Sequence, residues 1–461
     1  MSTELVGHLS GKAIHVHKCT LHLSDDEMKK IFNELNTLDT MKEICLLAKP
    51  LFLGDSVCGF EGIPYHDNTL SDALVLCCRY SDQNGKLKPS KNGLKRILQI
   101  ALGIEEDRMI KGATPVEIAM NVAYEQFRLQ ETPLNSIGRM WHILNNVWNT
   151  VPDQSIAPLS EIMAITGLSY SCIICYGMAA ASCDQGFIAE YSDETTEELE
   201  ASMKAGFTIG SHHKFLQWIS CNLADFSSIS TPPAYVRHPV VNSGIIPPGC
   251  TLPIHFSGSP NGIISRVSSG IYFDLIDRFN KGGNKNQFKT EFGYAFEKYV
   301  GEYLSEYLPS YEIVSEIEFG PKKARVKSVD YFVKKGNTLI LIEVKQSSIF
   351  AAAKFGGTID DISDSLSSNI EKAIKQLNLT FQNLKIFSEF SQFSSCSDVL
   401  KLVVVGDPLY NANNIIKLIL ESENNVSAAV TFRKGVTPWL PYRRLESMVA
   451  PDWIPGLLVA C

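Results

Sequence analysis

Two carboxylates and a lysine in the C-terminal part of the chain could act together on a phosphate ester. Asp330 precedes the triplet Glu343-Val344-Lys345, and the apolar run Leu339 to Ile342 leads directly into that triplet. A strand that is apolar on both faces is expected in the middle of a sheet, where terminal charges are costly to bury. A divalent cation offsets this cost, because carboxylate and main-chain carbonyl oxygens are its preferred ligands. The triplet therefore predicts metal-assisted hydrolysis, with Lys345 beside the attacking water.

A tight turn is needed to bring these side chains together. If Gly336 and Asn337 are its two central residues, Lys335 pairs with Thr338 and Asp330 falls opposite Glu343. A loop of four residues would shift the pairing by two positions and would still leave both carboxylates on one face. Either turn predicts a hairpin whose far end carries the chemistry.

The elements around this hairpin follow the order α-β-β-β-α-β-α-β. We expect helices over residues 288–308, 361–384 and 413–421, and strands over 312–319, 324–333, 338–345, 399–405 and 427–432. Strands followed by crossover helices predict a mixed sheet that helices cover on both faces. The expected fold class is α/β for this region and α+β for the whole chain.

The spacing of the three residues resembles the signature of the PD-(D/E)xK, or restriction-endonuclease-like, nuclease superfamily. Asp330, twelve further residues and Glu343-Val344-Lys345 on a hairpin follow that pattern within residues 288–432. Val329 stands where the family's name has proline, which is a frequent replacement. The resemblance implies a three-layer αβββαβ core that hydrolyses nucleic acid, DNA in preference to RNA, with Mg²⁺ or with Mn²⁺ in its place.

Further positions fit the same resemblance. Glu297 matches a glutamate that often points at the metal site from the helix before the first strand, although Glu291 or Glu302 could serve instead. Gln346 extends the triplet to Glu-x-Lys-Gln, and Gln376 matches a polar residue on the following helix. The implied catalytic residues are Asp330, Glu343, Lys345 and Glu297, and the implied metal ligands are Asp330, Glu343 and the carbonyl of Val344. Gln346 and Gln376 are expected to bind substrate.

Basic residues flank this predicted site and could contact a phosphate backbone. Lys327 and Lys334 are the two that we expect to bind substrate, and their basic neighbours are Lys322, Lys323, Arg325 and Lys335. A solvated sheet edge would show the same composition, so the sequence leaves both interpretations open.

Charge is distributed unevenly along the 461 residues. The whole chain has 42 basic and 50 acidic residues and a net charge of −8, so bulk basicity does not mark it as a nucleic-acid binder. Residues 266–461 contain 23 basic and 22 acidic residues, which leaves 19 basic and 28 acidic residues for 1–265. The net charge is therefore +1 for residues 266–461 and −9 for residues 1–265, which predicts different tasks for the two parts.

The first part is expected to be a mainly helical domain over residues 1–225. Apolar residues at helical spacing occur over 114–127, 136–148, 160–165 and 195–219, and strand-like runs are few. A strand is expected over 12–23, followed by a helix from 24 to about 35. Prolines, glycines and serines over 226–270 predict a junction, and 271–461 would then form the nuclease domain. The acidic helical domain favours a partner protein, a small ligand or a homodimer contact over a second DNA-binding module.

A cytoplasmic location without a membrane span is expected. The twelve cysteines have no regular spacing, and Met1 does not begin a basic and then apolar leader. The longest charge-free run, 162–183, is diluted by Gly, Ser and Thr. If it nevertheless crossed a bilayer, the protein would be a membrane-associated effector.

The expected function is that of a Mg²⁺-dependent endonuclease, by analogy an effector of a prokaryotic anti-phage or restriction-type defence system. The alternative is a catalytically silent protein with a nuclease fold that binds nucleic acid or serves as a scaffold in a larger complex.

Overall fold

The chain forms two compact units, which we describe separately. The computed structural model describes residues 3–9, 12–17, 20–52, 58–109, 133–182, 187–188, 209–228, 237–246, 248, 250, 252–280, 286–346, 371–406 and 458–460. Unit 1 comprises Met1–Lys111, Glu125–Gly138 and Ala157–Leu275, and unit 2 comprises Gly112–Tyr124, Arg139–Ile156 and Ile276–Cys461. Helices and mixed sheets occur together, which confirms the expected mixed α/β class.

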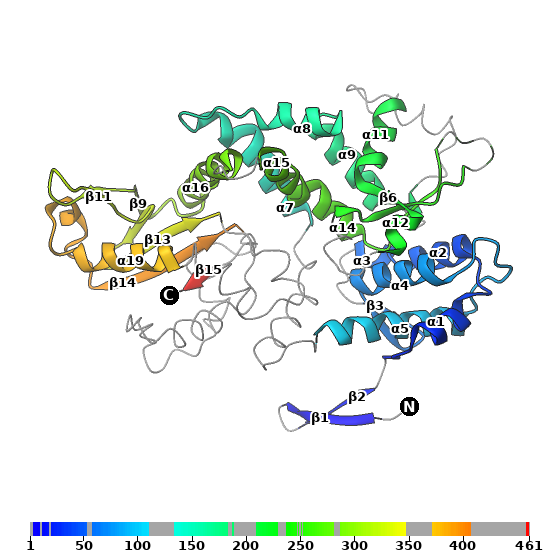
Figure 1. The fold of residues 1–461 in the computed structure, drawn as a ribbon. Coiled ribbons are helices and arrows are strands. Elements are labelled where there is room, and N and C mark those ends of the chain that lie inside the picture. Colours follow the sequence, from blue (N-terminus) through cyan, green and yellow to red (C-terminus); the bar gives the residue numbers. More distant parts are fainter. Residues whose placement is uncertain are drawn as a thin grey trace. The chain divides into compact units, whose positions relative to one another are not determined.

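Unit 1 is mainly helical (Figure 1). Its helices are α1 Asp25–Phe32, α2 Thr37–Leu46, α3 Lys49–Phe52, α4 Asp67–Tyr80, α5 Lys91–Met109, α8 Pro158–Thr166, α9 Tyr170–Ala181, α11 Ile209–Ile219, α12 Leu223–Ser227 and α14 Pro260–Ser265. Helices α7 Pro133–His142 and α15 Ile271–Phe279 each continue from unit 1 into unit 2. The strands are β1 Thr3–Leu9, β2 Lys12–His17, β3 Cys58–Phe60, β4 Ile63–Tyr65, β5 Phe187–Ile188, β6 Ser220–Asn222, β7 Val240–Asn242 and β8 His255–Phe256.

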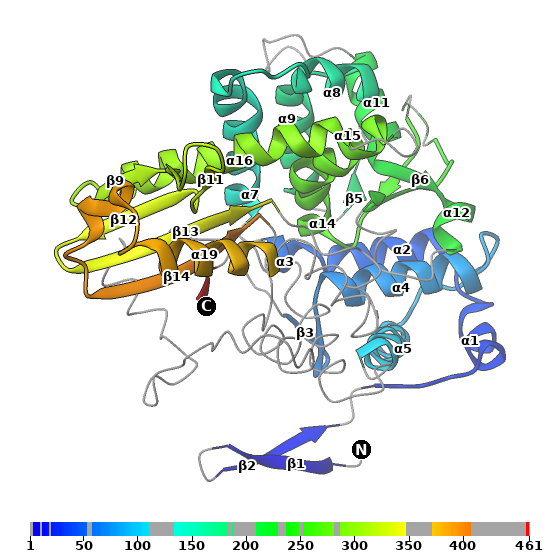
Figure 2. The ribbon, with the colours of Figure 1, turned by 60° about the vertical axis from the view of Figure 1, so that its left-hand side comes forward.

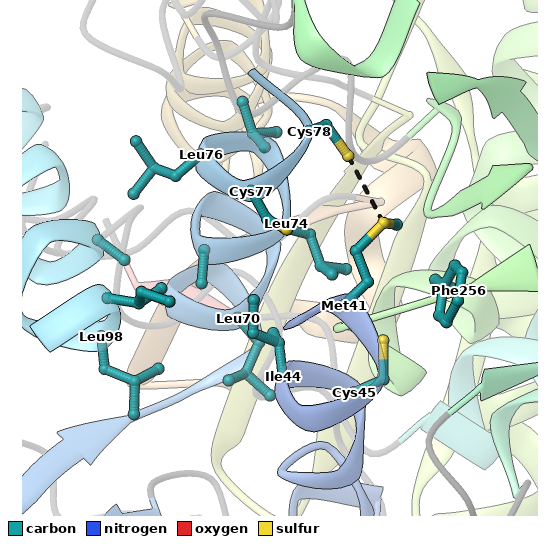
Figure 3. Close-up of a cluster of buried hydrophobic side chains, with 14 of the residues drawn as sticks. Met41, Ile44, Cys45, Leu70, Leu74, Leu76, Cys77, Cys78, Leu98 and Phe256 are labelled. Carbon is teal, nitrogen blue, oxygen red and sulfur yellow. Dashed lines mark hydrogen bonds between the residues drawn. The ribbon is translucent and has the colours of Figure 1, made fainter. Parts of the chain in front are cut away.

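The core of unit 1 forms around α4, which is buried on nearly all sides (Figure 3). Met41 and Ile44 of α2, Leu70 of α4 and Phe256 of β8 are fully buried in one cluster. The thiol of Cys78 donates a weak hydrogen bond to Met41 Sδ at 4.0 Å. Truncation of Ile44 or Leu70 to alanine would cost about 2–5 kcal/mol, because a cavity remains where the side chain was.

The described residues of the expected junction over 226–270 belong to unit 1. Strands β7 and β8 belong to a four-stranded sheet of unit 1 in the order β5-β8-β7-β6, with β6 and β7 parallel. Asp67 of α4 accepts hydrogen bonds from Ser259 Oγ at 2.8 Å and from Asn261 Nδ2 at 2.9 Å, which attach the start of α14 to the core. Ser259 caps the N-terminus of α14, and Pro260 is the first residue of that helix. These turn-forming residues therefore begin a short helix here. The division between units falls after Leu275.

Unit 2 contains a five-stranded sheet in the order β15-β14-β13-β12-β9 (Figures 1 and 2). Only β13 and β14 run parallel, and the other neighbours are antiparallel, so the sheet is mixed. The described elements from residue 287 onward are α16 Gln287–Tyr307, β9 Glu312–Ser315, β10 Glu318–Phe319, β11 Val326–Lys327, β12 Tyr331–Lys335, β13 Thr338–Lys345, α19 Lys372–Asn383, a 3₁₀ helix Ser388–Phe393, β14 Asp398–Val405 and β15 Leu458–Ala460. The order α-β-β-β-α-β is the expected one, except that two expected strands are each split.

The two helices lie on opposite faces of the sheet. Tyr331 points to α16, where its phenol bonds the carbonyl of Glu297. Phe332, the next residue of β12, points the other way into a core that includes Ile374 and Leu377 of α19. Neighbouring residues of a strand face opposite sides, so α16 and α19 form the outer layers of a three-layer arrangement.

The segment Arg139–Ile156 packs on α16 within unit 2. Here α7 continues as a π-helical turn Ile143–Val147 and a short 3₁₀ turn Trp148–Thr150, where the sequence predicts one helix over 136–148. The Trp148 indole stacks on Phe288 with ring centroids 5.5 Å apart. Its N–H donates to the carbonyl of Ile156 at 2.9 Å, which closes the turn that follows the helix.

Several expected elements lie outside the described residues. These are the helices over 114–127 and 413–421, the strand over 427–432, and the early parts of the helices over 195–219 and 361–384. Within the described part of the chain, no single helix has the length and apolar character to cross a membrane. Among the described helices, one pair, α8 and α9, satisfies that criterion when taken together, and the two helices are bent by 58° where they meet.

Candidate active site

The predicted hairpin is present with the two-residue turn. Lys335 pairs with Thr338 across Gly336 and Asn337, and Tyr331 pairs with Ile342 at the other end. Gly336 has φ of 58°, a left-handed conformation that a turn of this length favours. Asp330 lies one residue beyond the last pair and therefore level with Glu343. The register predicted from the sequence is confirmed.

Asp330 is fixed by the strand opposite it. The main-chain N–H of Val344 donates a 2.6 Å hydrogen bond to Asp330 Oδ2. The side chain is buried, and burial raises the pKa of its carboxyl, while the bond from Val344 and the charge of Lys345 act in the opposite direction. The carboxylate is thus held in one orientation at the end of the paired strands.

Glu343 and Lys345 form an ion pair on one face of β13, as their spacing predicts. Lys345 Nζ contacts Glu343 Oε1, and the lysine side chain is 28% exposed whereas that of Glu343 is 1% exposed. The second oxygen, Oε2, is buried and has no hydrogen-bond partner among the described residues. Burial and the charge of Asp330 raise the pKa of Glu343, against the opposing effect of Lys345. A buried carboxylate oxygen without a partner is costly unless a cation or water binds it.

Glu297 of α16 interacts electrostatically with the carboxylate of Asp330. Burial and the charges of Asp330 and Glu316 raise the pKa of Glu297 to about 7. The phenol of Tyr331 donates to the main-chain carbonyl of Glu297 at 3.0 Å and so connects α16 to β12. The helix residue is therefore held at the end of the hairpin where Asp330 lies.

The two alternatives to Glu297 have other partners. Glu291 is buried and accepts hydrogen bonds from the main-chain N–H groups of Ser155 and Ile156 at 3.1–3.3 Å. Glu302 lies 3.1 Å from His142 Nε2. Both attach the 139–156 segment to α16, so Glu297 is the glutamate of this helix that faces the hairpin carboxylates.

Glu316 is a further acidic residue of this group that the sequence does not reveal. Strand β9 pairs with β12 so that Ser315 lies opposite Tyr331. One step further, Glu316 is level with Asp330, and its charge raises the pKa of that carboxyl. Lys327 Nζ lies 2.9 Å from Glu316 Oε1. A long connection joins β9 to β12, so their register could not be counted from the sequence as the hairpin register could.

Gln376 supports the chain just before Asp330. Its side-chain amide donates to the carbonyl of Ser328 at 2.6 Å, and the hydroxyl of Thr380 accepts the N–H of Val329 at 3.1 Å. Both residues lie on α19, and Thr380 is fully buried. Gln376, expected to bind substrate, thus orients the segment that carries Asp330.

The remaining predicted substrate residues are dispersed. Lys327 lies at the carboxylate end of the hairpin, where it pairs with Glu316. Lys334 lies near the turn, at the opposite end of β12, where it donates to the carbonyl of Gln392 at 2.9 Å. A strand rises about 3.3 Å per residue, which separates Lys334 from Asp330 by roughly 13 Å. Gln346 follows β13 directly and is partly buried.

The oxygen atoms at the strand ends fit a hard divalent cation that takes only a few of its ligands from the protein. No three His, Cys, Asp or Glu side chains among the described residues form a metal-binding group. Two carboxylates from Asp330 and Glu343, with the main-chain carbonyl of Val344, are the oxygens on offer at the strand ends. Mg²⁺ suits such a set, because it usually keeps several waters and takes only one or two protein carboxylates. The partnerless Oε2 of Glu343 is the observation that favours a cation here.

Comparison of the chain with protein-family models, with curated proteins and with solved structures finds no match. The chemistry available at this site therefore follows from its geometry and its charges.

Proposed function

We propose that unit 2 is a metal-dependent phosphodiesterase with a restriction-endonuclease-like core, which hydrolyses nucleic acid and prefers DNA. The observation that carries this proposal is the placement of Asp330 and Glu343, two buried carboxylates level with each other, beside Lys345 at the end of paired strands. Burial of acidic groups whose pKa is raised costs stability, and catalytic sites are where proteins retain such arrangements.

Each residue has a defined task in this proposal. Asp330 and Glu343, with the Val344 carbonyl, hold Mg²⁺ or Mn²⁺, which supplies Lewis-acid activation of the phosphate and of water. Lys345 hydrogen-bonds the attacking water and offsets the negative charge that grows on the phosphate oxygens. Glu297, with a pKa of about 7, exchanges a proton near neutral pH.

Nucleic acid as the substrate is supported by the basic residues beside the carboxylates. The segment that precedes Asp330 exposes four basic side chains, namely Lys322, Lys323, Arg325 and Lys327.

Unit 1 serves in this proposal as the interaction part of the chain, which contacts a partner protein or a second copy. A cytoplasmic location is part of the same proposal. The role in prokaryotic defence is part of the same proposal.

Cleavage assays test the proposal directly. Purified protein is incubated with supercoiled plasmid, linear duplex, single-stranded DNA and RNA, each with Mg²⁺, Mn²⁺ or EDTA. We expect metal-dependent cleavage that Lys345→Ala abolishes while the melting temperature shows a folded protein. Lys385→Ala, which removes an exposed lysine after α19, is the matched control and should cleave normally. Cleavage that persists in Lys345→Ala would contradict the assignment.

A binding or scaffold role is the second candidate, and one contact favours it. Lys345 already neutralises Glu343 within the protein, as in an ion pair that only stabilises a strand end. In that case nucleic acid binds without metal and equally well to Asp330→Ala, and no substrate is cleaved under any metal condition.

A further inference from the structure

A small exposed hairpin, β10–β11, lies beside the site. Its strands pair only with each other, Glu318 with Lys327 and Phe319 with Val326. Phe319 is 1% exposed and packs on Phe390 with ring centroids 4.9 Å apart, so the base of the hairpin is anchored in the core. Beyond that anchor every residue from 321 to 327 is exposed. The hairpin is thus a fixed arm and not a buried sheet edge.

The arm is strongly basic. Four of its seven exposed residues carry positive charge, namely Lys322, Lys323, Arg325 and Lys327. The acidic residues nearest in sequence, Glu316 and Glu318, lie at its base, and Glu316 is paired with Lys327. The charge at the tip therefore suits a polyanion.

An exposed aromatic side chain lies near the arm. Tyr294 of α16 is 57% exposed, so the face of its ring is accessible to a ligand. It precedes Glu297 by three residues and so shares a helix face with it. The neighbouring Gly293 has no other atoms within 4 Å of its Cβ position, so the surface there is open. Lys327 of the arm lies 2.9 Å from Glu316, which is level with Asp330 in the sheet. Tyr294 also contributes to the raised pKa of Lys327.

Resting on the proposed function, we propose that Tyr294 and the β10–β11 hairpin form a platform for single-stranded nucleic acid. The ring of Tyr294 stacks on an unpaired base next to the scissile phosphate, while the basic residues of the hairpin contact the backbone. Aromatic stacking combined with a cationic track is how proteins bind single strands with little sequence preference. Bases inside a duplex are covered by their neighbours, so their faces are not accessible to the ring. The substrate class is therefore a single strand or the unpaired segment at a junction.

Binding is measured without cleavage, in the Lys345→Ala background with EDTA. Fluorescence anisotropy is recorded with a labelled 20-nucleotide single strand and with the blunt duplex of the same sequence, in DNA and RNA versions. We expect Tyr294→Ala to weaken single-strand binding by roughly 5- to 150-fold and duplex binding by less than about 2-fold. Tyr294→Phe and Tyr294→Trp should restore binding, because the ring and not the hydroxyl is required. Comparison of the DNA and RNA arms identifies the sugar that the platform accepts.

Two controls separate stacking from charge and from surface exposure. Phe381 is an aromatic residue on α19 that is 44% exposed, and Phe381→Ala should bind as the parent does. The double variant Lys322→Ala/Lys323→Ala should bind both the single strand and the duplex more weakly. The salt dependence of its binding should also be lower, since fewer counterions are released.

The platform is overturned if Tyr294→Ala binds single strands as the parent does, or if it loses single-strand and duplex binding equally. Either result leaves the cleavage test with Lys345→Ala untouched, so the proposed nuclease can stand while the platform fails. If the parent binds neither nucleic acid, the platform fails, and the cleavage test with metal still decides the proposed nuclease.

Discussion

The phenol of Tyr331 donates a 3.0 Å hydrogen bond to the main-chain carbonyl of Glu297. Tyr331 follows Asp330 directly, so this single bond connects the helix that carries one acidic residue to the strand that carries another. Gly301 lies one helical turn after Glu297, and its missing side chain lets the ring approach. A Cβ atom at position 301 would lie 2.6 Å from Cζ of Tyr331, so the ring would have to shift.

Replacement of this glycine should separate α16 from β12. We expect Gly301→Ala to lower the free energy of unfolding by about 1–3 kcal/mol, because overpacking outweighs the better helix propensity of alanine. Urea denaturation measures the change. Gly293→Ala on the same helix is the control, since nothing lies within 4 Å of its Cβ position, and it should stabilise by about 0.5–1 kcal/mol. Equal stability of the two variants would mean that the contact is not tight.

Gln376 should affect the chemistry without binding substrate. Its bond to the Ser328 carbonyl orients the segment before Asp330, so we expect Gln376→Ala to lower kcat by about 10-fold and to leave KM for nucleic acid within about 2-fold. Asn383→Ala is the control on the same helix, since among the described residues the side chain of Asn383 bonds only the Leu379 carbonyl. A rise in KM at unchanged kcat would instead support direct substrate contact.

Asp330→Asn should make the metal-free protein more stable and the enzyme inactive. Asparagine keeps an oxygen for the N–H of Val344, but it removes a buried charge that raises the pKa values of Glu297 and Glu343. We expect a gain of about 1 kcal/mol in EDTA and a loss of cleavage of at least about 100-fold. Thermal melts with and without Mg²⁺ measure the first effect and also show whether the stabilisation by Mg²⁺ disappears. A destabilised variant in EDTA would contradict the idea that these carboxylates repel one another.

The sequence predicted the hairpin well because its information is local. The bounds 338–345 of β13 agree with the structure, since an apolar run, a Gly-Asn turn and a charged end determine them within a few residues. The position of Asp330 opposite Glu343 follows from the same turn. Local patterns suffice where a two-residue connection fixes the register.

Features that depend on distant contacts were not predictable. The expected strands 312–319 and 324–333 are each split, because the hydroxyl of Ser328 accepts the N–H of Ile317 at 2.8 Å and replaces a regular ladder bond. This contact creates the separate β10–β11 hairpin and aligns Glu316 with the site. Likewise, the attachment of α14 to Asp67 turns a proline-rich stretch into part of a core. Side-chain bonds between residues far apart in sequence leave no periodic signal.

The raised pKa of Glu297 gives the protein a pH-dependent stability. In the unfolded chain this carboxyl loses its proton near its ordinary pKa of 4.5, whereas in the folded protein the pKa is about 7. Between these values the folded state binds more protons, so the free energy of unfolding falls as the pH rises. The stabilisation is complete below about pH 4.5 and is lost as the pH rises through about 7.

Glu297→Gln isolates this effect, because the amide has the same shape and does not titrate. In EDTA, we expect the melting temperature of the parent to fall between pH 5 and pH 7.5 and that of Glu297→Gln to fall less. Asp330, Glu343 and Asp67, whose pKa values are also raised, contribute to the remaining slope. His212 and His255 oppose it, because burial lowers their pKa values to about 4. Mg²⁺ should raise the melting temperature more at pH 7.5 than at pH 5.5, since only ionised carboxylates bind it. Identical pH profiles for the parent and Glu297→Gln would show that Glu297 titrates normally and is not part of the group at the strand ends.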